Sequence, residues 1–135
     1  MGRVLCLDHG EKRIGVAISD PLGLTAQALP FLTNRRGVFP DIHVLVKRYE
    51  VEKVLLGLPL DKKGQVGKKA EEVRLFGGHL SDHLGMDIDY IDERYSTVAA
   101  ERQLLEVDMN RKKRKQKIDS QAACFILQGY LDSLS

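Results

Sequence analysis

Three short apolar runs occupy the first third of the chain and are separated by turn-forming residues. The runs lie at about residues 3–8, 13–19 and 26–32, with a His-Gly-Glu-Lys turn after the first and an Asp-Pro-Leu-Gly turn after the second. Runs of this length, bounded by Gly and Pro, predict β-strands. Pro30 cannot donate a hydrogen bond to a neighbouring strand, so the third strand is expected at the edge of a sheet.

The rest of the chain alternates helical spacing with short apolar runs. Val73, Phe76 and Leu80, for example, recur every three or four residues, which is the spacing of one helix face. The predicted helices begin after Pro40, span the segment from Ala70 to Leu84, and cover 97–107 and 120–133, with strands at 53–57 and 86–91. The order βββαβαβαα predicts an α/β fold with a mixed five-stranded sheet, three antiparallel strands followed by parallel ones, and helices on both faces. The length fits a single domain, 1–135.

A carboxylate stands at the end of the first predicted strand. Because alternate side chains of a strand share a face, Asp8 lies on the face of Val4 and Cys6, in a row that is otherwise apolar. A buried ionised carboxylate is costly unless it is paired or bound to a metal ion. Asp8 is therefore a candidate metal ligand, and the alternative is that it only stabilises the turn.

Further acidic residues occur where other elements begin or end. Asp92 and Glu93 end the last predicted strand, and ligands of α/β sheets collect beyond such strand ends. Adjacent strand residues face opposite ways, so only one of the two points inward, and the strand pattern leaves open whether it is Asp92 or Glu93. Asp119 opens the last helix. The alternatives are that Asp92 and Glu93 offset a helix dipole and that Asp119 is a helix N-cap.

Composition and charge narrow the function further. The chain is 43% hydrophobic and 30% charged, no run is long enough to cross a bilayer, and a cytoplasmic location is expected. The two cysteines lie in apolar contexts and lack metal-ligand spacing. A net charge of +2 hides a basic run that predicts contact with a phosphate backbone, or else an exposed loop. The run comprises Arg111, Lys112, Lys113, Arg114, Lys115 and Lys117.

Four segments, taken together, resemble the YqgF/RuvX family. They run from Leu5 to Asp20, from Gly57 to Gly64, from Asp92 to Thr97 and from Ile118 to Leu127. The resemblance implies an RNase H-like fold, shared with RuvC-type Holliday-junction resolvases. It also implies a nuclease that processes the 5′ end of pre-16S ribosomal RNA in ribosome biogenesis, with junction-resolving DNA cleavage as the alternative.

The resemblance also assigns the acidic residues. Asp8, Glu93 and Asp119 become the catalytic, metal-binding residues of a site expected to hold two Mg²⁺ or Mn²⁺ ions. In RuvC-type nucleases a glutamate ends the fourth strand, but Gly57 stands here, so Glu93 from the fifth strand must substitute. His9 replaces the Tyr or Phe that is usual after the first aspartate. The expected partners are pre-16S RNA or branched DNA, together with the small ribosomal subunit, for a protein that is a monomer or a homodimer without membrane contact.

Two other readings compete with a nuclease. Asp8, Gly10 and Gly15 also fit an actin-like ATPase, but such enzymes close two domains around a nucleotide and this chain provides one. A non-catalytic nucleic-acid-binding module of RNase H-like fold is the second, and the filled acidic positions oppose it. His79 and His83 have a metal-compatible spacing but lack further ligands, which favours a solvated helix face.

Overall fold

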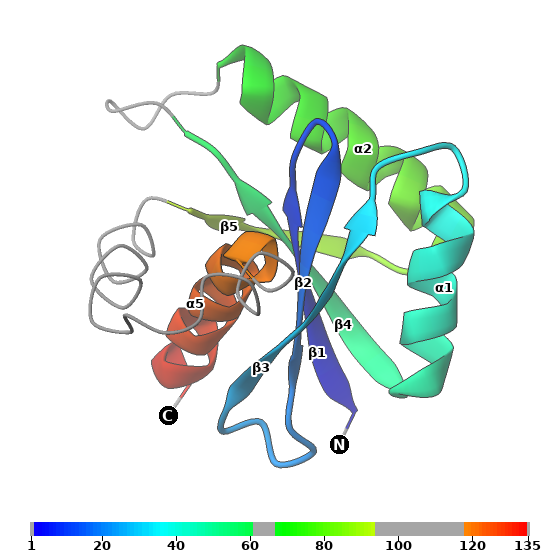
Figure 1. The fold of residues 1–135 in the computed structure, drawn as a ribbon. Helices are drawn as coiled ribbons and strands as arrows, with labels where there is room; N and C mark the ends of the chain where they lie inside the picture. Colours follow the sequence, from blue (N-terminus) through cyan, green and yellow to red (C-terminus); the bar gives the residue numbers. More distant parts are fainter. Residues whose placement is uncertain (1, 61–66, 94–117, 135) are drawn as a thin grey trace.

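The computed structural model describes residues 2–60, 67–93 and 118–134, with the side chains of residues 118 and 119 excepted. In this part of the chain, five strands form one sheet with the order β3-β2-β1-β4-β5 (Figure 1). The first three strands pair antiparallel, whereas β4 pairs parallel to β1 and β5 parallel to β4. The strands are β1 (Arg3–His9), β2 (Arg13–Ser19), β3 (Ala26–Thr33), β4 (Val51–Leu58) and β5 (Ile88–Asp92).

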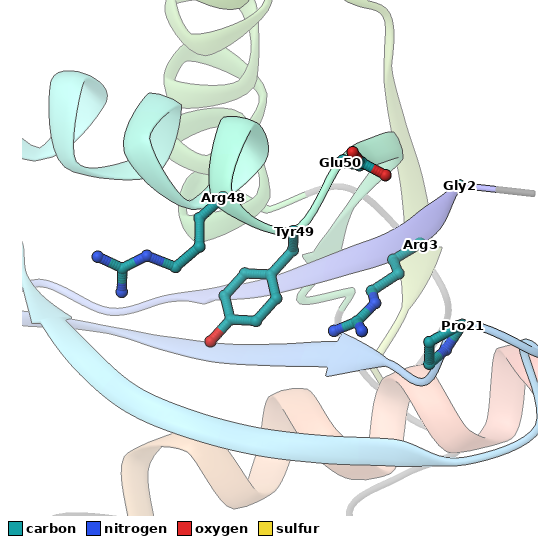
Figure 2. Close-up of a pocket in the computed structure, with 6 residues that line it drawn as sticks. All are labelled: Gly2, Arg3, Pro21, Arg48, Tyr49 and Glu50. Carbon is teal, nitrogen blue, oxygen red and sulfur yellow. The ribbon is translucent and has the colours of Figure 1, made fainter.

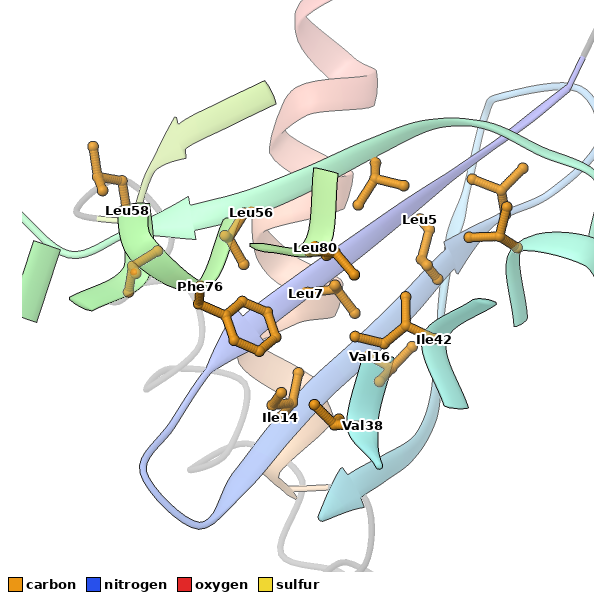
Figure 3. Packing of buried hydrophobic residues seen from close by; sticks show 14 of the residues in the cluster. Leu5, Leu7, Ile14, Val16, Val38, Ile42, Leu56, Leu58, Phe76 and Leu80 are labelled. Carbon is orange, nitrogen blue, oxygen red and sulfur yellow. The ribbon is translucent and has the colours of Figure 1, made fainter. Parts of the chain in front are cut away.

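Helices cover both faces of this sheet, as the alternation of apolar residues requires. Helices α1 (Val38–Arg48) and α2 (Lys68–Leu84) lie on one face, and α5 (Ile118–Ser133) lies on the other (Figure 1). Leu5 and Leu7 of β1 point to the first face, where they join the core formed with α1 and α2 (Figure 3). Cys6 points to the opposite face and packs in a smaller cluster with α5 residues such as Leu127. Helices therefore pack apolar side chains against both faces of the sheet.

The predicted architecture is confirmed, with shifts at element ends. β3 is an edge strand, as Pro30 predicts. Helix α1 begins at Val38, before Pro40. The helix tolerates Pro40 in its first turn because the N–H group that proline lacks would have no intrahelical partner there. β4 is longer than predicted at both ends, since parallel pairing with β1 and β5 extends over it. The helix predicted over 97–107 lies outside the described residues.

Helix α5 is fixed to the sheet by a buried hydroxyl group. Ser120, in the first turn of α5, accepts a hydrogen bond of 3.1 Å on Oγ from the backbone N–H of Val16, and its side chain is fully buried. The pairing of β2 with β3 shifts register between Ile14 and Val16, so this part of β2 is irregular. The hydroxyl group therefore fixes the start of α5 over β2, next to Gly15, which pairs with Asp8. None of the described helices is long and apolar enough to span a membrane.

Candidate active site

Asp8 lies at the end of β1 on the α5 side of the sheet. Its register partner on β2 is Gly15, and the parallel pairing of Leu7 with Leu56 on the other side brings Asp8 beside Gly57 of β4. Asp8 shares the strand face of Cys6, as predicted, and it is partly buried. The carboxylate is thus placed where β1 and β4 both end.

Glu93 arrives at the same place from β5. Its backbone N–H donates a 3.3 Å hydrogen bond to the carbonyl of Leu58, which continues the pairing of β5 with β4 by one residue. Ile91 packs in the cluster beneath α5, and alternation puts Glu93 on the same face as Ile91. The side chain of Glu93 is hydrogen-bonded to that of Asp8. The choice that the sequence left open between Asp92 and Glu93 therefore falls on Glu93.

Glu93 keeps its proton to a higher pH than an ordinary glutamate does. Burial, followed by the hydrogen bond to Asp8 and the negative charge of Asp8, raises the pKa of Glu93 from 4.5 to about 8, and Lys69 opposes this rise. At neutral pH the Glu93 carboxyl group is therefore protonated. Beneath the pair, burial raises the pKa of the Cys6 thiol well above its ordinary value, with both carboxyl groups adding to the effect. Cys6 is thus a neutral, fully buried thiol under the site.

Glu93 occupies space that a side chain at position 57 would fill. A Cβ atom on Gly57 would lie 2.6 Å from Oε1 of Glu93, 2.9 Å from its Cγ and 3.1 Å from Cδ1 of Ile126. In the sequence, Gly57 stands out only as the residue at the position where RuvC-type nucleases have a glutamate. An isolated glycine inside a strand often marks such a close approach, and this was the signal that could have revealed the contact.

The third predicted carboxylate, Asp119, belongs to the first turn of α5. That turn is fixed to β2 by Ser120, the next residue along the chain, on the sheet face that carries Asp8 and Glu93. The side chain of Asp119 lies outside the described part of the structure, as does the whole basic run 111–117. The structure therefore brings two of the three predicted acidic residues together and leaves the other assignments as predictions.

His9 points away from the acidic pair. Its ring packs on Phe76 of α2 with the ring centroids 4.6 Å apart, and burial lowers its pKa below the ordinary value. The Nε2 atom lies 3.3 Å from Nδ2 of Asn34, whose amide also donates 2.8 Å to the carbonyl of Gly10. A neutral His9 ring whose Nε2 accepts a hydrogen bond from the Asn34 amide agrees with both the lowered pKa and the contact with Asn34. His9 thus holds the β1–β2 turn against α2 and β3, which is a structural role.

The oxygen-only pair suits a hard divalent cation. Mg²⁺ and Mn²⁺ are bound through carboxylate oxygens, and a bound cation would favour the ionised form of Glu93 over the protonated form that its raised pKa favours. Within residues 2–60, 67–93 and 118–134 no three His, Cys, Asp or Glu side chains are grouped around one point. Asp8 and Glu93 are thus two of the three predicted ligands, and their carboxyl oxygens suit the expected Mg²⁺ or Mn²⁺.

A separate cavity of about 370 Å³ lies at the other end of β1, lined in part by Arg3, Arg48 and Tyr49 (Figure 2). The guanidinium of Arg3 lies over the Tyr49 ring, 5.4 Å from its centroid. Asp8 lies five positions further along the strand than Arg3, which is a distance of about 17 Å. The cavity therefore belongs to a different part of the surface from the acidic pair.

The mixed five-stranded sheet with helices on both faces has the RNase H-like fold. Two solved structures share the fold. The RuvC of T. thermophilus in complex with a Holliday junction has a TM-score of 0.60, with 13% identity over 99% of this chain and 96% of that one. The fowlpox virus resolvase bound to Holliday junction DNA has a TM-score of 0.58, with 16% identity over 98% of both chains.

The family follows from closer relatives. The model of the family described as "RuvX: Holliday junction resolvase" matches residues 2–133. A protein of Moorella thermoacetica, named "Putative pre-16S rRNA nuclease", is 50% identical over 98% of this chain and 96% of its own length. One of Sulfurihydrogenibium sp. with the same name is 47% identical over 100% of this chain and 93% of its own length. The chain belongs to the RuvX family, so the resemblance noted in the sequence and the predicted RNase H-like fold are confirmed.

Proposed function

We propose that this protein is a metal-dependent endonuclease that hydrolyses phosphodiester bonds and processes the 5′ end of pre-16S ribosomal RNA in the cytoplasm. The observation that carries the proposal is the contact between Asp8 and Glu93 across the end of β4, in a chain of the RuvX family. Two carboxyl groups held together against their mutual repulsion are costly to a fold, and a cation-binding role explains their presence. The names of the relatives support ribosomal RNA as the substrate.

Each acidic residue has a role in this proposal. Asp8 would hold the cation from β1, and Glu93 would hold it from the end of β5. Asp119 adds a third carboxylate from the first turn of α5, which the hydroxyl group of Ser120 fixes over the same sheet face. A divalent cation held by these oxygens supplies the positive charge that activates a water molecule and offsets the charge on the leaving oxygen.

Cations of the protein bind the substrate backbone. Lys69, in the first turn of α2, is close enough to oppose the rise in the pKa of Glu93, so its positive charge acts at the acidic pair. The basic run 111–117 directly precedes α5 in the sequence and gives a second contact for phosphate groups. These charges offset the repulsion between the acidic residues and a polyanion.

A second candidate function is the resolution of branched DNA. The two solved structures of the same fold are described with Holliday junctions, which keeps this activity as the alternative. RNA and DNA share the phosphodiester bond on which a carboxylate-bound cation acts, so the acidic pair is compatible with both nucleic acids.

Cleavage of two substrates side by side tests the proposal. A pre-16S 5′-leader RNA and a four-way DNA junction would be incubated with the protein in Mg²⁺ or Mn²⁺, with EDTA as the control. We expect cleavage of the RNA in metal and none in EDTA. Cleavage of the junction alone would replace the proposal with the alternative, and cleavage of neither, by the protein alone or with small ribosomal subunits, would contradict both.

A further inference from the structure

The backbone conformation at position 57 does not explain why a glycine is found there. Among the described glycines, positive φ angles occur at Gly23 and Gly85 and not at Gly57, so any residue could adopt the backbone conformation of Gly57. Glycine is a poor choice inside a central strand, because it packs no side chain and loses more entropy on folding. β4 is such a strand, paired on one side with β1 and on the other with β5.

The space above Gly57 supplies the explanation. This space is bordered by the Glu93 side chain, whose Oε1 would lie 2.6 Å from a Cβ atom at position 57, and by Cδ1 of the buried Ile126, at 3.1 Å. The first distance is shorter than any real Cβ contact, so a methyl group there must displace Glu93. Ile126 is held in the cluster beneath α5, which leaves the longer and more flexible Glu93 side chain to move.

Displacement of Glu93 has a direct consequence for the acidic pair. Glu93 crosses the end of β4 to reach Asp8 on β1, and Gly57 lies between these two strand ends in the sheet. Any side chain at position 57 therefore stands in the path of the Glu93 carboxyl group.

We propose that Gly57 is a positioning residue whose missing side chain lets Glu93 deliver the metal-binding carboxylate from β5. The inference rests on the proposed metal-dependent function and extends it to a residue without any chemistry of its own. A further consequence follows from the same geometry. The side chain of a Gly57→Glu variant would enter the space that the Glu93 carboxyl group now fills. The metal-binding carboxylate could therefore be supplied from β4 in place of β5.

The first test is Gly57→Ala, with Gly78→Ala as the matched control because a Cβ atom on Gly78 meets nothing within 4 Å. Mn²⁺ affinity is measured by calorimetry, and folding by circular dichroism and thermal unfolding. We expect Gly57→Ala to fold and to bind Mn²⁺ about 10- to 100-fold more weakly, as for other losses of ligand support. The control should bind as the wild type does. Wild-type affinity and cleavage in Gly57→Ala would overturn the inference.

The second test exchanges the carboxylate between strands. Glu93→Gly and Gly57→Glu are made singly and together, and Mn²⁺ affinity is measured for all three proteins. We expect Glu93→Gly to lose binding and the double variant to regain at least tenfold of it. A folded double variant that binds no better than Glu93→Gly would contradict the exchange. If the wild type binds Mn²⁺ but cleaves neither RNA nor DNA, the nuclease proposal fails while these affinities still decide the role of Gly57.

Discussion

The Glu93 side chain is hydrogen-bonded to that of Asp8, although β5, which Glu93 directly follows, is not a neighbour of β1 in the sheet. β4 lies between their strands, and its Gly57 leaves the space through which Glu93 reaches across. The pair is also partly buried above the Cys6 thiol, which strengthens the interaction between its charges. A site of this kind is unfavourable when both groups are ionised, and it becomes favourable with a proton or a cation between them.

The stability of the metal-free protein should therefore fall as the pH rises from about 5 to about 8. The pKa of Glu93 is raised to about 8 in the folded protein, so in this interval the folded state holds a proton that the unfolded state has lost. This contribution to stability is complete below the ordinary pKa of 4.5 and disappears as the pH passes through 8. Glu93→Gln should remove the dependence and raise Tm at pH 8 by a few degrees.

Calorimetric unfolding in EDTA at pH 5, 6.5 and 8 checks this prediction. Glu71→Gln, an exposed position on α2, is the control and should keep the wild-type pH dependence. Parallel pH profiles for the wild type and Glu93→Gln would show that the pKa of Glu93 is not raised in the folded protein.

Ser120→Ala should destabilise the protein and weaken the site together. Loss of the hydroxyl group leaves the buried N–H of Val16 without its partner, at a cost of about 1–3 kcal/mol in the free energy of unfolding. The first turn of α5 then loses its fixed position over β2, so we expect cleavage to fall by about tenfold. Ser133→Ala is the control, because Ser133 is exposed and bonds to Tyr130 of its own helix. Equal Tm values for the two variants would contradict this role of Ser120.

Removal of positive charge from the basic run should weaken nucleic-acid binding without abolishing cleavage. We expect the triple change of Lys112, Lys113 and Lys115 to Gln to reduce the slope of log affinity against log salt by about 2, since each phosphate contact of a single strand contributes about 0.7. The measurement is a fluorescence-anisotropy titration of the leader RNA at several salt concentrations. The control is a variant in which Lys47 and Arg48, both exposed on α1, are replaced by Gln. An unchanged slope in the triple variant would show that the run does not contact phosphate.

Much of the fold could be predicted because its signals are local. The alternation of Cys6 with Leu5 and Leu7 reports two covered faces, and Pro30 marks an edge strand. The same alternation places Asp8 on the α5 face. The end of β5 was harder, because Asp92 and Glu93 differ only in which face each takes, and that depends on the pairing of β5 with β4.

The supporting residues could not be predicted because their partners are distant in the sequence. The bond from Val16 to Ser120 joins residues 104 positions apart. The contact of Gly57 with Glu93 depends on which strands are neighbours, which a single sequence does not specify. His9 departs from the family pattern already in the sequence, but its partners Phe76 and Asn34 appear only in the folded chain.

The most direct test of the central claim is metal-dependent cleavage by Asp8→Asn. The variant keeps the size of the side chain and removes its charge, so Asp82→Asn, exposed on α2, is the matched control. Cleavage of the leader RNA would be measured in Mn²⁺ for the wild type and both variants, after circular dichroism has shown that all three fold. We predict that Asp8→Asn loses at least about a hundredfold in rate while the control keeps wild-type activity. Cleavage by folded Asp8→Asn at the wild-type rate would contradict the assignment of the site.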